Sequence, residues 1–158
     1  MNRLIFFASA VGVAAFALRG ERAAHAQEGR ARPRITAARA ADHTVWDSVF
    51  TDSQSVRGDS LFRTGCIKCH GEDLAGNDSV ASLTGDGFLS DWDGLSVFDL
   101  YDKILSTMPS DNPNTVPSNQ VVDLVAFLLS KNTFPAGTQV LPDDVAVLKT
   151  IKFIKTKP

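Results

Sequence analysis

The sequence predicts an all-α fold, a small domain of about three to four main helices. Two observations predict it. Residues 118–131 carry apolar side chains at helical spacing, namely Val121, Leu124, Val125 and Leu128, with Phe127 beside them. A second such stripe follows Ser96 and comprises Val97, Leu100, Tyr101, Ile104 and Leu105. The sequence around the two cysteines also lacks the alternation of apolar and polar residues that marks a strand.

The first helix is expected to begin near Thr51, Asp52 and Ser53 and to run toward Gly65. Side chains of these three types accept hydrogen bonds from the unpaired N–H groups at a helix start. Gly58 falls inside this helix, where glycine costs about 1 kcal/mol relative to alanine. We therefore expect another part of the chain to approach the helix closely at Gly58.

The remaining elements follow from capping and breaking signals. Ser96 and Asp99 form a capping-box pattern that begins the second helix, which ends where Pro109 follows Met108. Residues 71–94 are rich in Gly, Asp, Asn and Ser and are expected to form a loop. We expect one domain over residues 44–140 and a tail over residues 141–158 that packs on it.

Residues 1–26 have the features of an export signal. A positive start at Arg3 precedes an apolar run over residues 4–18, and Ala24-His25-Ala26 is a small-x-small site for cleavage after Ala26. A retained membrane anchor is the alternative, although the run is short for crossing roughly 30 Å of hydrocarbon. Residues 27–43 are rich in arginine, lack an apolar stripe and are expected to be a flexible linker.

Cys66-Ile67-Lys68-Cys69-His70 is the pattern by which c-type haem is attached to a protein. Each thiol can bind one haem vinyl group, and the histidine after the second thiol is then placed as the proximal iron ligand. The motif therefore predicts one covalent haem c, with thioether bonds from Cys66 and Cys69 and an axial bond from His70.

Three alternatives compete for the two cysteines. A redox dithiol of the thioredoxin type belongs in a βαβ setting, which the flanking sequence does not suggest. A structural zinc site needs four ligands, so His43 would have to join Cys66, Cys69 and His70. A disulfide between residues this close in sequence would close no useful loop.

Met108 is the candidate for the second axial ligand. It is the only methionine beyond the predicted leader, and Pro109 stiffens the backbone directly after it. Ligation by histidine and methionine would raise the reduction potential, whereas ligation by His43 would lower it and an empty position would admit small ligands. The alternative is that Met108 only fills a gap in the core.

The charge distribution argues against a nucleic-acid partner. The chain has a formal net charge of −2, and residues 51–135 contain five basic residues against twelve acidic ones. Proteins that bind nucleic acid present clustered Lys and Arg to the phosphates. We therefore expect no nucleic-acid binding.

Together these residues resemble the class I c-type cytochromes over residues 51–135. The likeness rests on Gly58 and Phe62 in the first helix, the motif at residues 66–70, Met108-Pro109, and Phe127 in the last helix. The family has a cytochrome c-like fold wrapped around one covalent haem, in which the first and last helices cross at the glycine and aromatic positions. Leu83-Thr84-Gly85, Trp92 and residues 134–137 look like the single-haem domains that accompany pyrroloquinoline-quinone dehydrogenases. That likeness implies that Trp92 lies near a haem propionate.

The expected function is that of a periplasmic electron carrier, and not of an enzyme. It would pass one electron from a dehydrogenase or reductase, such as a quinoprotein dehydrogenase, to an oxidase or other acceptor. One alternative is a haem subunit held permanently in a dehydrogenase complex, with the apolar segment 45–50 and the tail as interface. Another is a haem enzyme or gas sensor with an open distal site. Membrane attachment is expected only if the leader is retained.

Overall fold

A computed structural model describes residues 43–158, so the predicted signal peptide and all but the last residue of the predicted linker lie outside the described residues. The elements, in chain order, are β1 (His43–Thr44), α1 (Asp52–Gly65), α2 (Ile67–His70), α3 (Gly85–Trp92), α4 (Val97–Thr107), α5 (Ser118–Lys131), α6 (Val145–Leu148) and β2 (Ile151–Lys152). The all-α prediction is confirmed, because the described strands are two residues each. No helix among these residues has the length and apolar character needed to cross a membrane.

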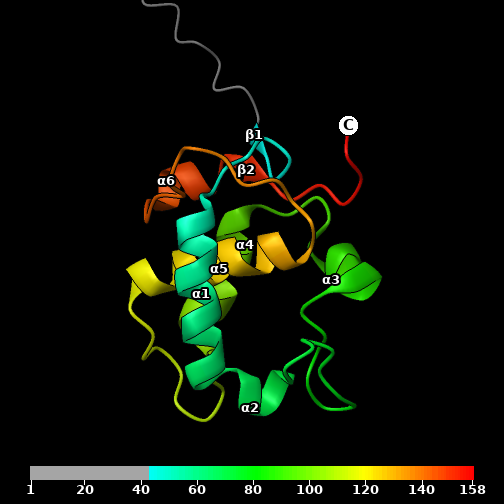
Figure 1. Ribbon diagram of the computed structural model, residues 1–158, viewed down its shortest axis with the longest axis vertical. Coiled ribbons are helices and arrows are strands. Elements are labelled where there is room, and N and C mark those ends of the chain that lie inside the picture. The colour runs from blue at the N-terminus through cyan, green and yellow to red at the C-terminus, as the bar shows by residue number, and fades with distance from the viewer. Residues whose placement is uncertain (1–42) are drawn as a thin grey trace, which may run out of the picture. The chain divides into compact units, whose positions relative to one another are not determined.

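Helix α1 crosses α5, and this contact forms the centre of the domain (Figure 1). The predicted cap at Thr51 is present as a capping box with Gln54. The close approach expected at Gly58 is also present, since a Cβ atom there would lie 2.1 Å from the carbonyl oxygen of Asp123. Next to the crossing, the rings of Phe62 and Phe127 pack with their centroids 5.2 Å apart.

A bidentate ion pair joins the two crossing helices at the same level. Arg57 on α1 donates from Nε and from a terminal guanidinium nitrogen to the two carboxylate oxygens of Asp123 on α5, each at 2.7 Å. Asp123 is buried although it carries a charge. The fork geometry of the guanidinium fixes orientation as well as distance, so the pair adds a directional contact to the packing of α1 on α5.

Helix α4 begins as the sequence predicts. Its capping box joins Ser96 and Asp99, and the helix ends just before Met108. Helix α5 covers the predicted range, and nine consecutive residues from Val121 to Leu129 are buried in it. Both α1 and α4 pack on α5, so α5 is the element against which the rest of the domain is arranged.

Residues 71–94 differ from the expectation, because helix α3 lies within the predicted loop. Although α3 is rich in glycine and aspartate, it contains an apolar pair one turn apart, Phe88 and Trp92, whose ring centroids are 6.1 Å apart. Phe88 also packs edge-on against Phe153, near the end of the chain, at 6.0 Å. The helix therefore depends on a distant tertiary contact, which local composition does not reveal.

The tail and the first described residues form a layer over the end of the domain away from α2 (Figure 1). Strands β1 and β2 pair in parallel, with His43 opposite Ile151, so His43 lies in a strand and not in the linker. Phe153 donates its backbone N–H to Leu95 at 2.8 Å and is fully buried. The indole of Trp46 donates to the carbonyl of Ile154, also at 2.8 Å.

Candidate functional site

The predicted haem motif lies directly after the helix that crosses α5. Helix α1 ends at Gly65, Cys66 caps it, and Ile67–His70 form the short helix α2. Both cysteines have free thiols, with Cys66 half-buried and Cys69 exposed. Burial, with a smaller contribution from the neighbouring Cys69, raises the pKa of the Cys66 thiol. The short helix thus presents both sulfurs within one turn.

The ring of His70 has a defined orientation. Its Nδ1 lies 3.2 Å from the carbonyl oxygen of Ala81. A carbonyl oxygen can only accept a hydrogen bond, so this contact places a proton on Nδ1, and in the neutral ring the lone pair is then on Nε2. Histidines that bind metal through one ring nitrogen characteristically donate the other N–H to a backbone carbonyl or carboxylate. His70 therefore has the tautomer that an axial ligand needs.

Met108 and Cys66 line one cavity of about 250 Å³. Its apolar walls come from three helices and from the segment after α4, and include Leu61, Ile104, Val116 and Leu124. Two of its polar residues, Thr64 and Thr115, direct their hydroxyls to the backbone carbonyls of Ser60 and Asn112. Cys69 and His70 are not among its described lining residues. Met108, the predicted thioether ligand, and Cys66, the first thiol of the motif, therefore lie on the same cavity.

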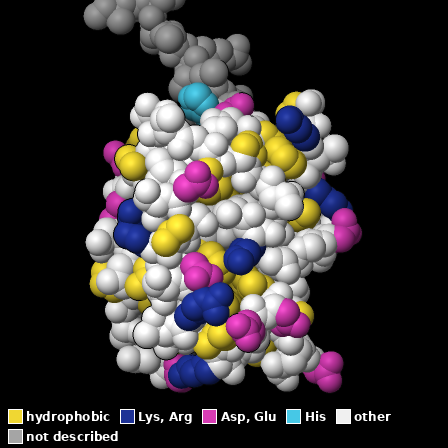
Figure 2. All heavy atoms as spheres, viewed as in Figure 1, with side chains coloured by type: hydrophobic (Ala, Val, Ile, Leu, Met, Phe, Trp, Pro, Cys, Tyr) yellow, Lys and Arg dark blue, Asp and Glu magenta, His cyan; other side chains and the backbone are white. Residues whose placement is uncertain are grey.

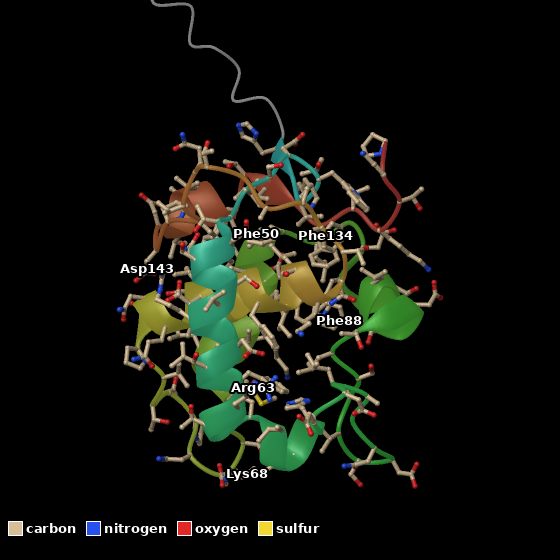
Figure 3. All side chains as sticks on the ribbon, in the orientation of Figure 1. Phe50, Arg63, Lys68, Phe88, Phe134 and Asp143 are labelled. Carbon is tan, nitrogen blue, oxygen red and sulfur yellow. The ribbon has the colours of Figure 1, made fainter. Side chains whose placement is uncertain are left out.

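A surface ion pair connects the motif to the segment that carries Met108. Lys68 Nζ lies 2.7 Å from Oδ2 of Asp111, three residues after Met108. This hydrogen bond raises the pKa of Lys68 and lowers that of Asp111. Figure 3 shows Lys68 and Arg63 at the end of the domain where α2 lies. The sequence does not predict this pair, since nothing in the spacing of Lys68 and Asp111 indicates a contact.

Arg63 adds a second connection at the same end of the domain. It binds Asp59 one turn earlier at 2.9 Å and reaches Glu72, two residues after His70, at 3.5 Å. Basic and acidic side chains alternate on this part of the surface (Figure 2). Some of the acidic residues that outnumber the basic ones in the sequence are therefore paired with arginine or lysine here.

Trp92 and His43, the two remaining candidates, lie apart from this cavity. Trp92 ends α3, is half-buried and packs against Phe88. His43 is in β1, at the opposite end of the described domain from α2 (Figure 1), so it is badly placed to act with His70 as a zinc or haem ligand. Within residues 43–158 no group of three or more His, Cys, Asp or Glu side chains gathers as a metal site would require.

The residues present fit a covalent haem. Two free thiols stand within one turn, a histidine has its Nε2 lone pair available, and a methionine lines an apolar cavity with the first thiol. In c-type sites cysteine thiols attach the haem through its vinyl groups, and imidazole and thioether are the axial ligands. An apolar wall also limits access of water, which is one of the ways in which a protein tunes haem iron.

Comparison with known proteins gives two matches. Residues 54–128 match the family model described as cytochrome c oxidase, cbb3-type, subunit III. Among solved structures, the crystal structure of the sulfane dehydrogenase SoxCD from Paracoccus pantotrophus is similar, with 24% identity and a TM-score of 0.47. That match covers 68% of this chain and 61% of the other, so the chain spans less than two thirds of its length. No curated protein matches the chain significantly.

Proposed function

We propose that this chain is a single-haem electron carrier, because residues 54–128 match the family model reported above and the motif at residues 66–70 is the pattern of c-type haem attachment. It accepts one electron from a dehydrogenase or reductase and passes it to a terminal acceptor. In this proposal no substrate bond is made or broken, so the chain is not itself an enzyme. The bound haem supplies a one-electron redox centre, and the protein positions and shields it.

The observation that carries the proposal is the arrangement of the motif and Met108. Cys66 and Met108 line one apolar cavity, and His70 has its Nδ1 proton committed to Ala81. In the proposal Cys66 and Cys69 attach one haem c covalently, and His70 and Met108 are the axial ligands. Ligation by histidine and methionine raises the reduction potential, and it occupies the position at which small molecules would otherwise bind.

The contacts around these residues support a rigid site. Lys68 joins the motif to the segment after Met108, and Arg63 joins α1 to Glu72, two residues after the motif's end. Exposed ion pairs of this kind contribute little free energy singly. Their value here is that they restrain the two segments that carry the proposed ligands. Restrained ligands change position little between the two oxidation states, which favours electron transfer.

The proposal extends to location and partners. An export signal over residues 1–26 would take the chain to the periplasm, where c-type haem is attached to exported proteins. The partners would be redox proteins, such as a quinoprotein dehydrogenase as donor and an oxidase as acceptor. Trp92 would lie near a haem propionate, and its half-buried position at the end of α3 permits an indole N–H to reach a polar group.

A haem subunit held permanently in a dehydrogenase complex is the alternative. It was expected to use residues 45–50 and the tail as its interface. Within these segments Val45, Phe50 and Phe153 are fully buried in the domain, whereas Val145 and Val147 of the tail are exposed. Size-exclusion chromatography of protein purified from its native source distinguishes the two, because a carrier migrates as a monomer and a subunit migrates only in a larger complex.

The test uses the full chain produced with haem attachment in the periplasm. The oxidised protein is expected to be low-spin with a sulfur–iron charge-transfer band, and a pyridine haemochrome assay is expected to report one c-type haem per chain. Met108→Ala is expected to lose the band, lower the reduction potential and bind carbon monoxide when reduced. Ser110→Ala, on an exposed residue two positions later, serves as the matched control.

Two outcomes contradict the proposal. A colourless protein with free or zinc-loaded thiols would exclude haem attachment. Rapid carbon monoxide binding by the reduced wild type at neutral pH would indicate an open distal position, as in a haem enzyme or gas sensor.

A further inference from the structure

Asn132 is a buried amide that no part of the proposed function uses. It follows the last residue of α5 and is 6% exposed. Its Nδ2 donates to the carbonyl oxygens of Leu128 at 2.9 Å and Leu83 at 3.0 Å. Its Oδ1 accepts from the backbone N–H of Gly85 at 3.1 Å. Both amide protons and the amide oxygen are therefore engaged, two of the three bonds with a segment nearly fifty positions earlier in the chain.

That segment, residues 81–85, contains the hydrogen-bond acceptor of His70. Ala81 accepts from His70 Nδ1, and Asn132 binds Leu83 and Gly85 on the same segment. Leu83 also donates its N–H to Leu74 at 2.8 Å. The segment is thus fixed on one side by α5 and on the other by the residues that follow the haem motif. Figure 3 shows Phe88 on α3 and Phe134, two residues after Asn132, on the same side of the domain.

Close packing limits other positions for the acceptor. A Cβ atom on Gly76 would lie 2.1 Å from the carbonyl oxygen of Val80 and 2.8 Å from the carbonyl of Ala81. Gly76 also donates its N–H to the carbonyl of His70 at 3.1 Å. The carbonyl of Ala81 is therefore confined between the loop that follows His70 and the segment that Asn132 binds.

We propose that Asn132 is a positioning residue for His70, because it keeps residues 81–85 on α5 and so fixes the carbonyl that accepts from Nδ1. This inference rests on the proposed ligation of iron by His70. A hydrogen bond from the second ring nitrogen increases the basicity of a metal-bound histidine. A more basic imidazole favours the oxidised iron, so an intact bond lowers the reduction potential.

Asn132→Leu tests this with a side chain of similar size that forms no hydrogen bonds. The variant leaves the carbonyl of Leu83 and the N–H of Gly85 without their side-chain partner, which releases the segment, whereas the carbonyl of Leu128 keeps its bond from the backbone N–H of residue 132. The reduction potential of the holoprotein is expected to become more positive. The proton on His70 Nδ1 is expected to exchange with solvent faster than in the wild type.

Gln54→Leu is the matched control. Gln54 is also a buried amide, 2% exposed, and it binds the N–H and the carbonyl of Leu141 at 2.8 and 2.9 Å. Gln54 also accepts from the backbone N–H of Thr51 in the capping box at the start of α1, and all of its partners lie at the other end of the domain from α2. The control is expected to lower stability in urea as Asn132→Leu does, while leaving the reduction potential unchanged.

The result that overturns the inference is an unchanged potential in Asn132→Leu, or equal shifts in both variants. Should Asn132→Leu fail to fold, the smaller change Asn132→Ser takes its place with the same expectation. Exchange in the wild type gives an independent measure: once each rate is corrected for the intrinsic exchange of its group, the His70 Nδ1 proton and the Gly85 amide are expected to give the same opening free energy, and a much smaller one for the His70 proton contradicts the inference. A wild type without haem would instead refute the proposed function, so the two failures are distinguishable.

Discussion

Gly58→Ala is expected to destabilise the domain strongly, because it pushes α1 away from α5. The added methyl carbon would lie 2.1 Å from the carbonyl oxygen of Asp123 and 2.6 Å from Cβ of Phe127. Carbon and carbonyl oxygen atoms normally approach to about 3.3 Å at closest. Both neighbours belong to the rigid helix α5, so the crowding is relieved only if the two helices separate.

The size of the effect follows from two opposing contributions. Overpacking a close contact costs about 3 kcal/mol or more where no flexible side chain can move aside. Alanine is intrinsically better than glycine in a helix by about 1 kcal/mol. The net loss is therefore about 2 kcal/mol or more, a large share of the roughly 5 to 15 kcal/mol that stabilises a typical domain. Separation would also disturb the bidentate pair between Arg57 and Asp123.

Urea unfolding followed by far-UV circular dichroism measures this loss. Gly87→Ala is the control, since Gly87 is also helical and a Cβ atom there meets nothing within 4 Å. The control is expected to be unchanged or slightly stabilised. Equal stability of the two variants would refute the argument that the crossing of α1 and α5 depends on the missing side chain. The Gly58 variant is also expected to show altered haem absorbance, because the Cys66 motif follows α1 directly.

Three further predictions concern other parts of the domain. Hydrogen bonds from the side chain and the backbone N–H of Ser96 lower the pKa of Asp99. The cap therefore stabilises the fold at pH values above the usual aspartate pKa of about 3.9. This stabilisation is lost as the pH falls through the lower pKa of the folded state. Ser96→Ala should lower the free energy of unfolding by about 1 kcal/mol at pH 7. The difference in unfolding free energy between this variant and the wild type, measured in urea, should become smaller at strongly acidic pH. A difference that does not change with pH would argue against the cap. Lys68→Ala should raise the affinity of the oxidised protein for cyanide about twofold at low salt, since Asp111 then no longer restrains the Met108 segment, and high salt should abolish the difference. Phe153→Ala should cost about 3 to 5 kcal/mol in thermal unfolding, because the ring is fully buried, and a loss below 1 kcal/mol would mean that the tail does not belong to the core.

The features that the sequence predicted correctly are those fixed by neighbouring residues. The caps at Thr51 and Ser96 each depend on a partner three positions away, so a short window of sequence contains the whole signal. Gly58 was informative for a related reason, since an interior helical glycine has a cost that only a close contact offsets. The positions of α1 and α4 followed from such signals, and that of α5 followed from the helical spacing of its apolar residues.

What the sequence did not predict depends on partners far along the chain. Helix α3 needs Asn132 at its start and Phe153 on its apolar face. The pairing of β1 with β2 joins residues about a hundred positions apart over only two residues each, too short for any alternation to appear. At the site, the motif and Met108 were identifiable from residue types, while the acceptor of His70 is a backbone carbonyl, which carries no signature in the sequence.

The relative position of the two proposed ligands depends on how helices pack and not on the conformation of a loop. The motif follows α1 and Met108 follows α4, and both helices pack on α5. The distance between the histidine and the methionine is therefore set by how α1 and α4 are seated on one common helix. Changes at the crossing, such as Gly58→Ala, should then alter both stability and the spectrum of the iron. Changes in the tail, such as Phe153→Ala, should alter stability with a smaller change in the spectrum of the folded fraction, because the ring packs on Phe88 and Phe134 and reaches the segment that holds His70 only through α3.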